Sequence, residues 1–166
     1  MTPLCASTPR SPHVRVSRRR AAAALGALGA GLLALSGCDK PTPVATVTVG
    51  ENSVHTEAAC YDDGGPVPAS ELRGCLRDRD AKTIKVDPDE IVRFGVDPAI
   101  ADKKWTILVG GRPLGDPSGK TYREVPGNVF FDTQLGLNGR NATVSVLEGS
   151  GKEANGLWSF RFEKDG

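Results

Sequence analysis

Histidine and methionine are scarce in this chain of 166 residues. Its one methionine is Met1, and only His55 of the two histidines follows residue 37. One histidine and a disulfide cannot supply the ligands of a zinc site, and a blue-copper site would lack its axial methionine and its thiolate. A Ser-His-Asp triad would have to use His55, but the chain has neither Gly-x-Ser-x-Gly nor Ser-x-x-Lys. We therefore expect no catalytic residue, no metal and no cofactor.

The chain also lacks an apolar run long enough for a membrane-spanning helix. Its longest run, Ala21–Leu35, has about 15 residues, whereas a spanning helix needs roughly 20. Five arginines and no acidic residue precede this run, which is the order of a secretory signal. We therefore predict that residues 1–37 are a signal peptide. The Ser17–Arg20 run also fits twin-arginine export, and the alternative is an ordinary basic leader.

The end of the apolar run has the residues of a lipobox. Leu35, Ser36 and Gly37 precede Cys38, where a signal peptidase would cut and where the sulfur would take a diacylglycerol. Two acyl chains anchor a protein stably, whereas one does not. We therefore expect residues 38–43 to be a lipidated cysteine and a short tether, on the outer face of the cytoplasmic membrane.

Basic residues are concentrated in the predicted leader. Its five arginines leave 16 lysines and arginines against 20 acidic residues in the rest of the chain, a net charge near −4. An acidic domain without a basic run argues against binding of nucleic acid and against direct electrostatic adhesion to anionic lipid. The lipid on Cys38 would then be the contact with the membrane.

The four cysteines have separate predicted roles. Cys5 lies in the leader and Cys38 takes the lipid, which leaves Cys60 and Cys75 in an oxidising compartment. A disulfide between them would close a loop of about 16 residues and stabilise the fold by on the order of 3 kcal/mol. A redox-active pair is the alternative, but it typically has C-x-x-C spacing.

Residues 44–166 have the pattern of one β-domain. Short β-branched segments alternate inward and outward positions and are separated by turns. One helix is expected from Glu71, capped by Ser70, whereas Pro98–Asp102 and Gly110–Gly119 are expected to be a turn and a loop. The pattern predicts a mainly β fold, an immunoglobulin-like β-sandwich of about seven to nine strands with one short helix and one disulfide. The expected strands are Val44–Val49, Ser53–Ala58, Lys82–Val86, Ile91–Val96, Lys104–Val109, Lys120–Val125, Val129–Thr133, Ala142–Leu147 and Leu157–Glu163.

Two glycine-rich segments resemble nucleotide-binding motifs only superficially. Gly115–Thr121 has three residues between its glycines instead of four, and Pro117 has no N–H for a phosphate. Gly149–Ala154 joins two strands that alternate like a hairpin, so we predict a loop there. Asp87–Glu90 lacks the glycine and the spaced glutamate of a calcium loop, so we expect an acidic turn.

Most of the chain after the leader resembles a family of small actinobacterial envelope lipoproteins, domain of unknown function 2771. The resemblance implies an envelope location and brings no catalytic or ligand-binding residue. Its residues are Leu35–Cys38, Val47–Val49, Ala59–Tyr61, Cys75, Val96–Ala101 and Trp105.

A lipid anchor beside a domain without a catalytic motif favours a non-enzymatic module that binds an envelope component, protein or glycan. A flat patch on one sheet would support it. The alternative is an extracytoplasmic carrier or sensor of a small ligand, which needs an apolar cavity. Its end loops would be Tyr61–Pro68, Gly110–Gly119 and Gly127–Arg140.

Two further sets of side chains are candidates for a site. An enzyme would need paired carboxylates with raised pKa in a cleft, and a carbohydrate platform would need exposed aromatic rings. The acids in question are Asp62, Asp63, Asp116 and Asp132, and the aromatic residues outside the inward pattern are Tyr61, Tyr122 and Phe130.

Overall fold

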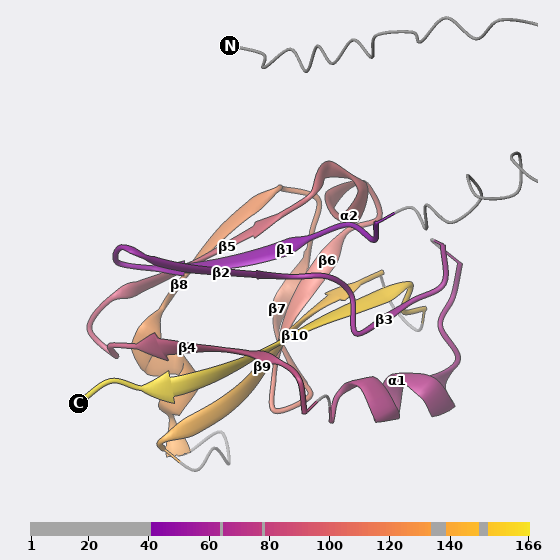
Figure 1. Cartoon of the computed structure of the whole chain (residues 1–166). Coiled ribbons are helices and arrows are strands. Elements are labelled where there is room, and N and C mark those ends of the chain that lie inside the picture. The colour runs from indigo at the N-terminus through magenta and orange to yellow at the C-terminus, as the bar shows by residue number, and fades with distance from the viewer. Residues whose placement is uncertain (1–40, 64, 78, 134–138, 150–152) are drawn as a thin grey trace, which may run out of the picture. The chain divides into compact units, whose positions relative to one another are not determined.

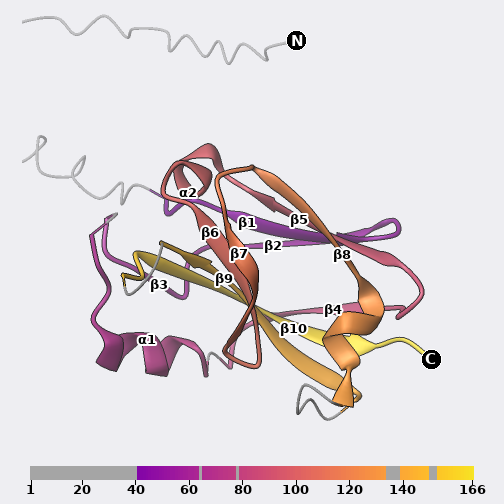
Figure 2. The same ribbon diagram turned by 180° about the vertical axis from the view of Figure 1, so that it is seen from behind.

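The computed structural model describes residues 41–63, 65–77, 79–133, 139–149 and 153–166. The expected signal peptide and the lipobox residues Leu35, Ser36, Gly37 and Cys38 lie outside these ranges. The described residues belong to one compact unit. Two sheets pack face to face in it (Figures 1 and 2), so the predicted mainly β sandwich is confirmed.

We call the four-stranded sheet A and the six-stranded sheet B. Sheet A has the order β2 (Asn52–Thr56), β1 (Ala45–Val49), β5 (Ile91–Val96), β8 (Tyr122–Pro126), all antiparallel. Sheet B has the order β3 (Cys60–Tyr61), β10 (Gly156–Lys164), β9 (Asn141–Glu148), β6 (Trp105–Val109), β7 (Arg112–Ser118), and β4 (Lys82–Val86) pairs in parallel with β10. The described residues form ten strands, more than the expected seven to nine, because β3 and β7 lie in segments that we expected to be irregular.

The core lies between the two sheets, where the predicted inward side chains meet. Phe94 of β5 and Phe162 of β10 are fully buried, with ring centroids 6.2 Å apart. Phe130 packs against both rings, 5.9 Å from Phe94 and 4.9 Å from Phe162, the latter in edge contact. Aromatic pairs at such distances add about 0.5–1.5 kcal/mol beyond the area that they bury. The outward positions Ser145 and Ser159 are buried as well, which the alternation did not predict.

Phe130 belongs to a 3-10 helix, η1 (Gly127–Phe131), and the expected strand Val129–Thr133 is therefore wrong. Phe130 and Phe131 are both buried. A strand would point these neighbours to opposite faces, whereas a helical turn can direct both into the core. Burial also removes Phe130 from the possible carbohydrate platform.

The segment Pro98–Asp102 is the helix α2 instead of a turn. Pro98 occupies the first helical turn, where its missing N–H costs nothing, and Ile100 and Ala101 are buried. The helix α1 (Ala69–Cys75) starts before the expected residue, so Ser70 lies inside it and provides no cap. Among the described residues, no helix is long and apolar enough to cross a membrane.

The expected loop Gly110–Gly119 contains β7, which pairs with β6 through a bulge. Pro113 and Pro117 hid this strand in the sequence. Proline cannot donate to a ladder, but an edge strand leaves one side unpaired and tolerates it. Because β7 is the last strand of sheet B, both prolines are compatible with it.

The predicted disulfide Cys60–Cys75 is confirmed, and its Cα atoms are 5.9 Å apart. It joins β3 to the end of α1. Both β3 and β4 pair with the same strand, β10, at its start and at its end. Between β3 and β4 the chain runs away from β10 through α1. The disulfide links the start of this segment to the end of α1.

Candidate functional site

Two described residues of the predicted tether, Thr42 and Pro43, and Val44 after it are hydrogen-bonded to the domain. Trp158 donates from Nε1 to the carbonyl oxygen of Pro43 at 2.6 Å, and the N–H of Ala58 donates to Oγ1 of Thr42 at 3.2 Å. Val44 donates its N–H to Oδ2 of Asp97 at 2.8 Å and accepts from the Asp97 N–H at 3.1 Å. Residues 42–44 are therefore a fixed part of the sandwich.

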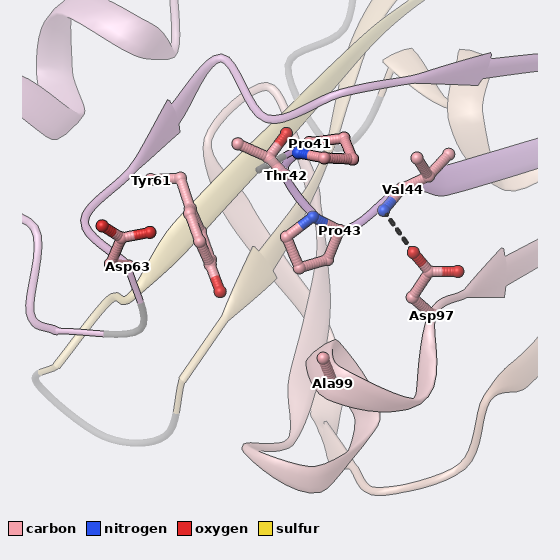
Figure 3. A pocket seen from close by; sticks show the side chains of 8 residues that line it. All are labelled: Pro41, Thr42, Pro43, Val44, Tyr61, Asp63, Asp97 and Ala99. Atoms are coloured by element: carbon pink, nitrogen blue, oxygen red, sulfur yellow. Dashed lines mark hydrogen bonds between the residues drawn. The ribbon is translucent and has the colours of Figure 1, made fainter. Parts of the chain in front are cut away.

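This bonded tether forms one wall of a pocket of about 370 Å³, which we call the tether pocket (Figure 3). Tyr61 projects from β3 on the opposite wall, with Asp63 beside its ring, and Ala99 of α2 closes the lower side. The pocket lies at the end of the sandwich that holds α2 and β3. Its lining residues are Pro41, Thr42, Pro43, Val44, Tyr61, Asp63, Asp97 and Ala99.

The tether pocket has a negative electrostatic environment. Among the described residues that line it, the charged ones are Asp63 and Asp97, and none is a lysine or an arginine. Burial raises the pKa of the Tyr61 hydroxyl, and the nearby carboxylates of Glu148 and Asp63 raise it further. A negative potential at the phenol favours its neutral form and would favour a cation in the pocket.

Glu148 is a buried carboxylate at the end of β9. Its register places it in one row with Trp105 of β6, Gly156 of β10 and Tyr61 of β3. Its side chain is 1% exposed and its Oε1 lies 3.5 Å from Nζ of Lys103. Oε2 has no hydrogen-bond partner among the described residues. Burial raises the pKa of Glu148, and the Lys103 ammonium partly opposes that shift.

The outer face of sheet A is a second candidate surface. One row across its four strands, which we call the Gly95 row, contains His55, Thr46, Gly95 and Tyr122. A Cβ atom built on Gly95 would have only the Thr46 Cβ within contact distance, at 4.0 Å. The row is therefore open above Gly95, between Thr46 and the exposed ring of Tyr122.

The polar side chains next to this row hold one another in place. The Tyr122 hydroxyl donates to Oε1 of Glu124 at 2.6 Å, and the same carboxylate oxygen lies 3.4 Å from Nε of Arg93. The hydrogen bond to Glu124 raises the pKa of Tyr122. Fixing these side chains before a ligand arrives lowers the entropy cost of binding.

The predicted site residues are distributed over separate surfaces. His55 is exposed on β2, as expected, and Tyr61 and Tyr122 lie in the tether pocket and on the outer face of sheet A. Of the loop acids, Asp63 lines the tether pocket, whereas Asp62 and Asp116 line two different hollows. The part of the chain that the structure describes contains no group of three or more His, Cys, Asp or Glu that could hold a metal ion.

No family model, no curated protein and no solved structure matches this chain.

No local sequence pattern assigns a site role to three residues that shape these surfaces. Asp97 precedes the segment expected to be a turn, and its contact with Val44 spans 53 residues of sequence. Glu148 lies two residues after Val146, the last expected inward residue of its strand. Extending the alternation by one residue beyond the expected end at Leu147 would have placed Glu148 inward. Gly95 lies inside an expected strand, and an interior glycine there was the available signal.

Proposed function

We propose that this chain is a membrane-anchored lipoprotein of the cell envelope that acts as a non-enzymatic glycan-binding module. The lipid on Cys38 holds it at the outer face of the cytoplasmic membrane. The outer face of sheet A recognises the glycan. The observation that carries the recognition step is the open Gly95 row beside the exposed ring of Tyr122.

A glycine inside a strand weakens the strand, so it needs a reason. Gly95 pairs regularly with β1 and β8 and has no bulge. It is not among the residues with positive φ, and its nearest potential Cβ contact is at 4.0 Å. The remaining reason for a glycine at this position is that a ligand approaches the backbone closely there, which a larger side chain would block.

The chemistry of the face favours a glycan over a protein partner. Among the described residues, the exposed large hydrophobic side chains are Ile91 (39%) and Tyr122 (47%), both on this face. The Arg93–Glu124 pair separates them, so the face has no apolar centre of the kind that stable protein interfaces have. An aromatic ring beside ordered polar groups suits a sugar, which has an apolar C–H face and a rim of hydroxyls.

The test is co-sedimentation of the purified full chain, carrying Cys38→Ser to keep it soluble, with insoluble envelope polysaccharide. Gly95→Leu should reduce binding at least tenfold by filling the open row. Gly74→Leu is the matched control, because a Cβ at Gly74 of α1 meets nothing within 4 Å. Equal binding by the Gly95→Leu chain would refute the site, and binding abolished by prior protease treatment of the envelope would indicate a protein partner instead.

The anchor has its own test. In cells, Cys38→Ser should release the protein from the membrane fraction, whereas Cys5→Ser should leave it there. Retention of the Cys38→Ser chain on the membrane would contradict lipidation at that residue.

A small-ligand carrier or sensor is the second candidate, and the tether pocket is the observation that favours it. A volume of about 370 Å³ lies at the lower end of the roughly 300–1,000 Å³ of ligand pockets. A thermal-shift screen of small metabolites, with stabilisation lost in Ala99→Leu, would support this function over the first.

A further inference from the structure

The bonded tether limits how far the tether pocket can lie from the proposed lipid anchor. The described chain begins at Pro41, and Thr42, Pro43 and Val44 are each bonded to the domain. Three Cα–Cα steps separate Cys38 from Pro41, which covalent geometry limits to about 11 Å. A lipid on Cys38 would therefore keep Pro41, and with it the pocket wall, within about 11 Å of the anchored residue, close to the head groups of the bilayer.

The charge of the pocket restricts what it can hold there. Asp63 and Asp97 line it, and the carboxylate of Glu148, which Lys103 partly neutralises, adds to the negative potential at Tyr61. An anionic phosphate or lipid would be repelled by these groups. An ammonium group would be attracted to the carboxylates and to the face of the Tyr61 ring.

The apolar part of the pocket fits a short carbon chain next to that ammonium. Pro41, Pro43, Val44 and Ala99 provide apolar surface around Tyr61. The head group of an ethanolamine phospholipid has this composition: an ammonium group, two methylenes and a phosphate ester. The phosphate ester would point out of the pocket. The tether wall places the site where such head groups are concentrated.

We propose that the tether pocket binds the ammonium group of an ethanolamine phospholipid in the membrane to which the chain is anchored. This inference rests on the proposed lipid anchor. Asp63 attracts the ammonium, Tyr61 packs against it, and Asp97 both fixes the tether wall and contributes charge. Because the anchor keeps the head groups at high effective concentration, a millimolar affinity fills the site and sets the orientation of the domain on the membrane.

The first experiment measures head-group binding without the membrane, by nuclear magnetic resonance of the full chain carrying Cys38→Ser. Glycerophosphoethanolamine should shift the amide signals of Val44, Tyr61 and Asp63. Glycerophosphoglycerol, in which a glycerol replaces the ethanolamine, should not. Equal shifts with the two compounds, or no shift at these amides, would overturn the proposal.

The variants separate the pocket from general charge effects. Asp63→Asn should weaken binding by up to about fivefold, the usual effect of one exposed charge pair. Ala99→Leu should abolish it by filling the pocket. Asp89→Asn is the matched control, since it removes the same charge from the turn between β4 and β5, away from the pocket lining. Unchanged binding by both pocket variants would refute the site.

The second experiment distinguishes a lipid head group from a dissolved amine. At millimolar accessible lipid, the concentration that this affinity requires without the anchor, part of the same chain should float with vesicles that contain phosphatidylethanolamine and phosphatidylcholine, and none with vesicles of phosphatidylcholine alone. Binding of free ethanolamine without flotation would overturn the lipid as ligand. Loss of lipidation at Cys38 with intact head-group binding would refute the anchor and leave the ligand assignment standing, so the two failures are distinguishable.

Discussion

The indole nitrogen of Trp158 donates a hydrogen bond to the carbonyl oxygen of Pro43 at 2.6 Å, across 115 residues of sequence. Trp158 is fully buried and lies on β10, an interior strand of sheet B that pairs with β3, β4 and β9. The bond therefore joins the stable interior of the domain to the segment that leads to the proposed anchor. Because a buried donor without a partner is costly, the tether and the tryptophan stabilise each other.

Trp158→Phe should release the tether. The change removes the hydrogen bond and part of a buried ring, so the free energy of unfolding should fall by about 2–4 kcal/mol. The amide of Val44, which bonds to Asp97, should then exchange with deuterium much faster. Hydrogen-exchange mass spectrometry of peptides covering residues 41–46 would measure this effect.

Trp105→Phe is the control for that experiment. Trp105 is equally buried, and its Nε1 donates to the carbonyl oxygen of Lys120 at 2.7 Å. Its loss should destabilise the domain to a similar degree without selectively exposing the tether. If both variants accelerated exchange at Val44 equally, the tether would depend on global stability and not on the Trp158 bond.

Removal of the disulfide should destabilise the domain without changing its fold. Cys60 and Cys75 enclose a sequence separation of 15, for which the chain-entropy model gives about 3 kcal/mol. The double variant Cys60→Ala, Cys75→Ala should lower the denaturation midpoint, and a reductant should have no further effect on it. A wild-type chain whose midpoint does not change with reductant would show that the bond contributes no stability.

The sequence predicted the core of the fold because its strands alternate cleanly. Trp158, Phe160 and Phe162 are inward as expected, and all three are fully buried. It did not predict β7, where prolines conceal an edge strand, or η1, where two adjacent buried phenylalanines break the period of two. The position of β7 at the edge of sheet B and the burial of both phenylalanines of η1 become visible only in the assembled fold.

The candidate surfaces were harder to predict than the core. The tether pocket depends on Asp97 reaching Val44 and on Tyr61 facing them from another strand. Such contacts follow from the pairing of strands that are distant in sequence, so no local pattern encodes them. The Gly95 row likewise becomes visible only once the register of four strands is known.

Gly95→Thr should stabilise the domain while impairing glycan binding. A glycine in a strand is less favourable than a β-branched residue, and the nearest potential Cβ contact is at 4.0 Å, so about 0.5–1 kcal/mol should be gained. Denaturant unfolding and polysaccharide co-sedimentation on the same preparation would measure both quantities. A destabilised variant would mean that the fold itself requires the glycine, and the functional argument for Gly95 would fail.

The stability of the domain should depend on the ionisation of Glu148. Burial raises the pKa of this carboxyl in the folded state above its ordinary value of 4.5, so the folded chain holds the proton more tightly than the unfolded chain. The stabilising contribution is complete below pH 4.5 and is lost as the pH rises through the folded pKa. At neutral pH the ionised carboxylate therefore costs stability, although Lys103 offsets part of that cost.

Glu148→Gln removes this titration and isolates its effect. The difference in unfolding free energy between the variant and the wild type should shift in favour of the variant as the pH rises from 4 to 7, by roughly 1.4 kcal/mol for each unit of pKa shift. Glu163→Gln, a change on β10 that leaves the buried carboxylate intact, is the control and should show no comparable trend. Chemical denaturation at several pH values would measure the difference. A Glu148→Gln curve parallel to the wild-type curve over this range would show that the folded and unfolded chains ionise Glu148 alike, and that its burial is not energetically significant.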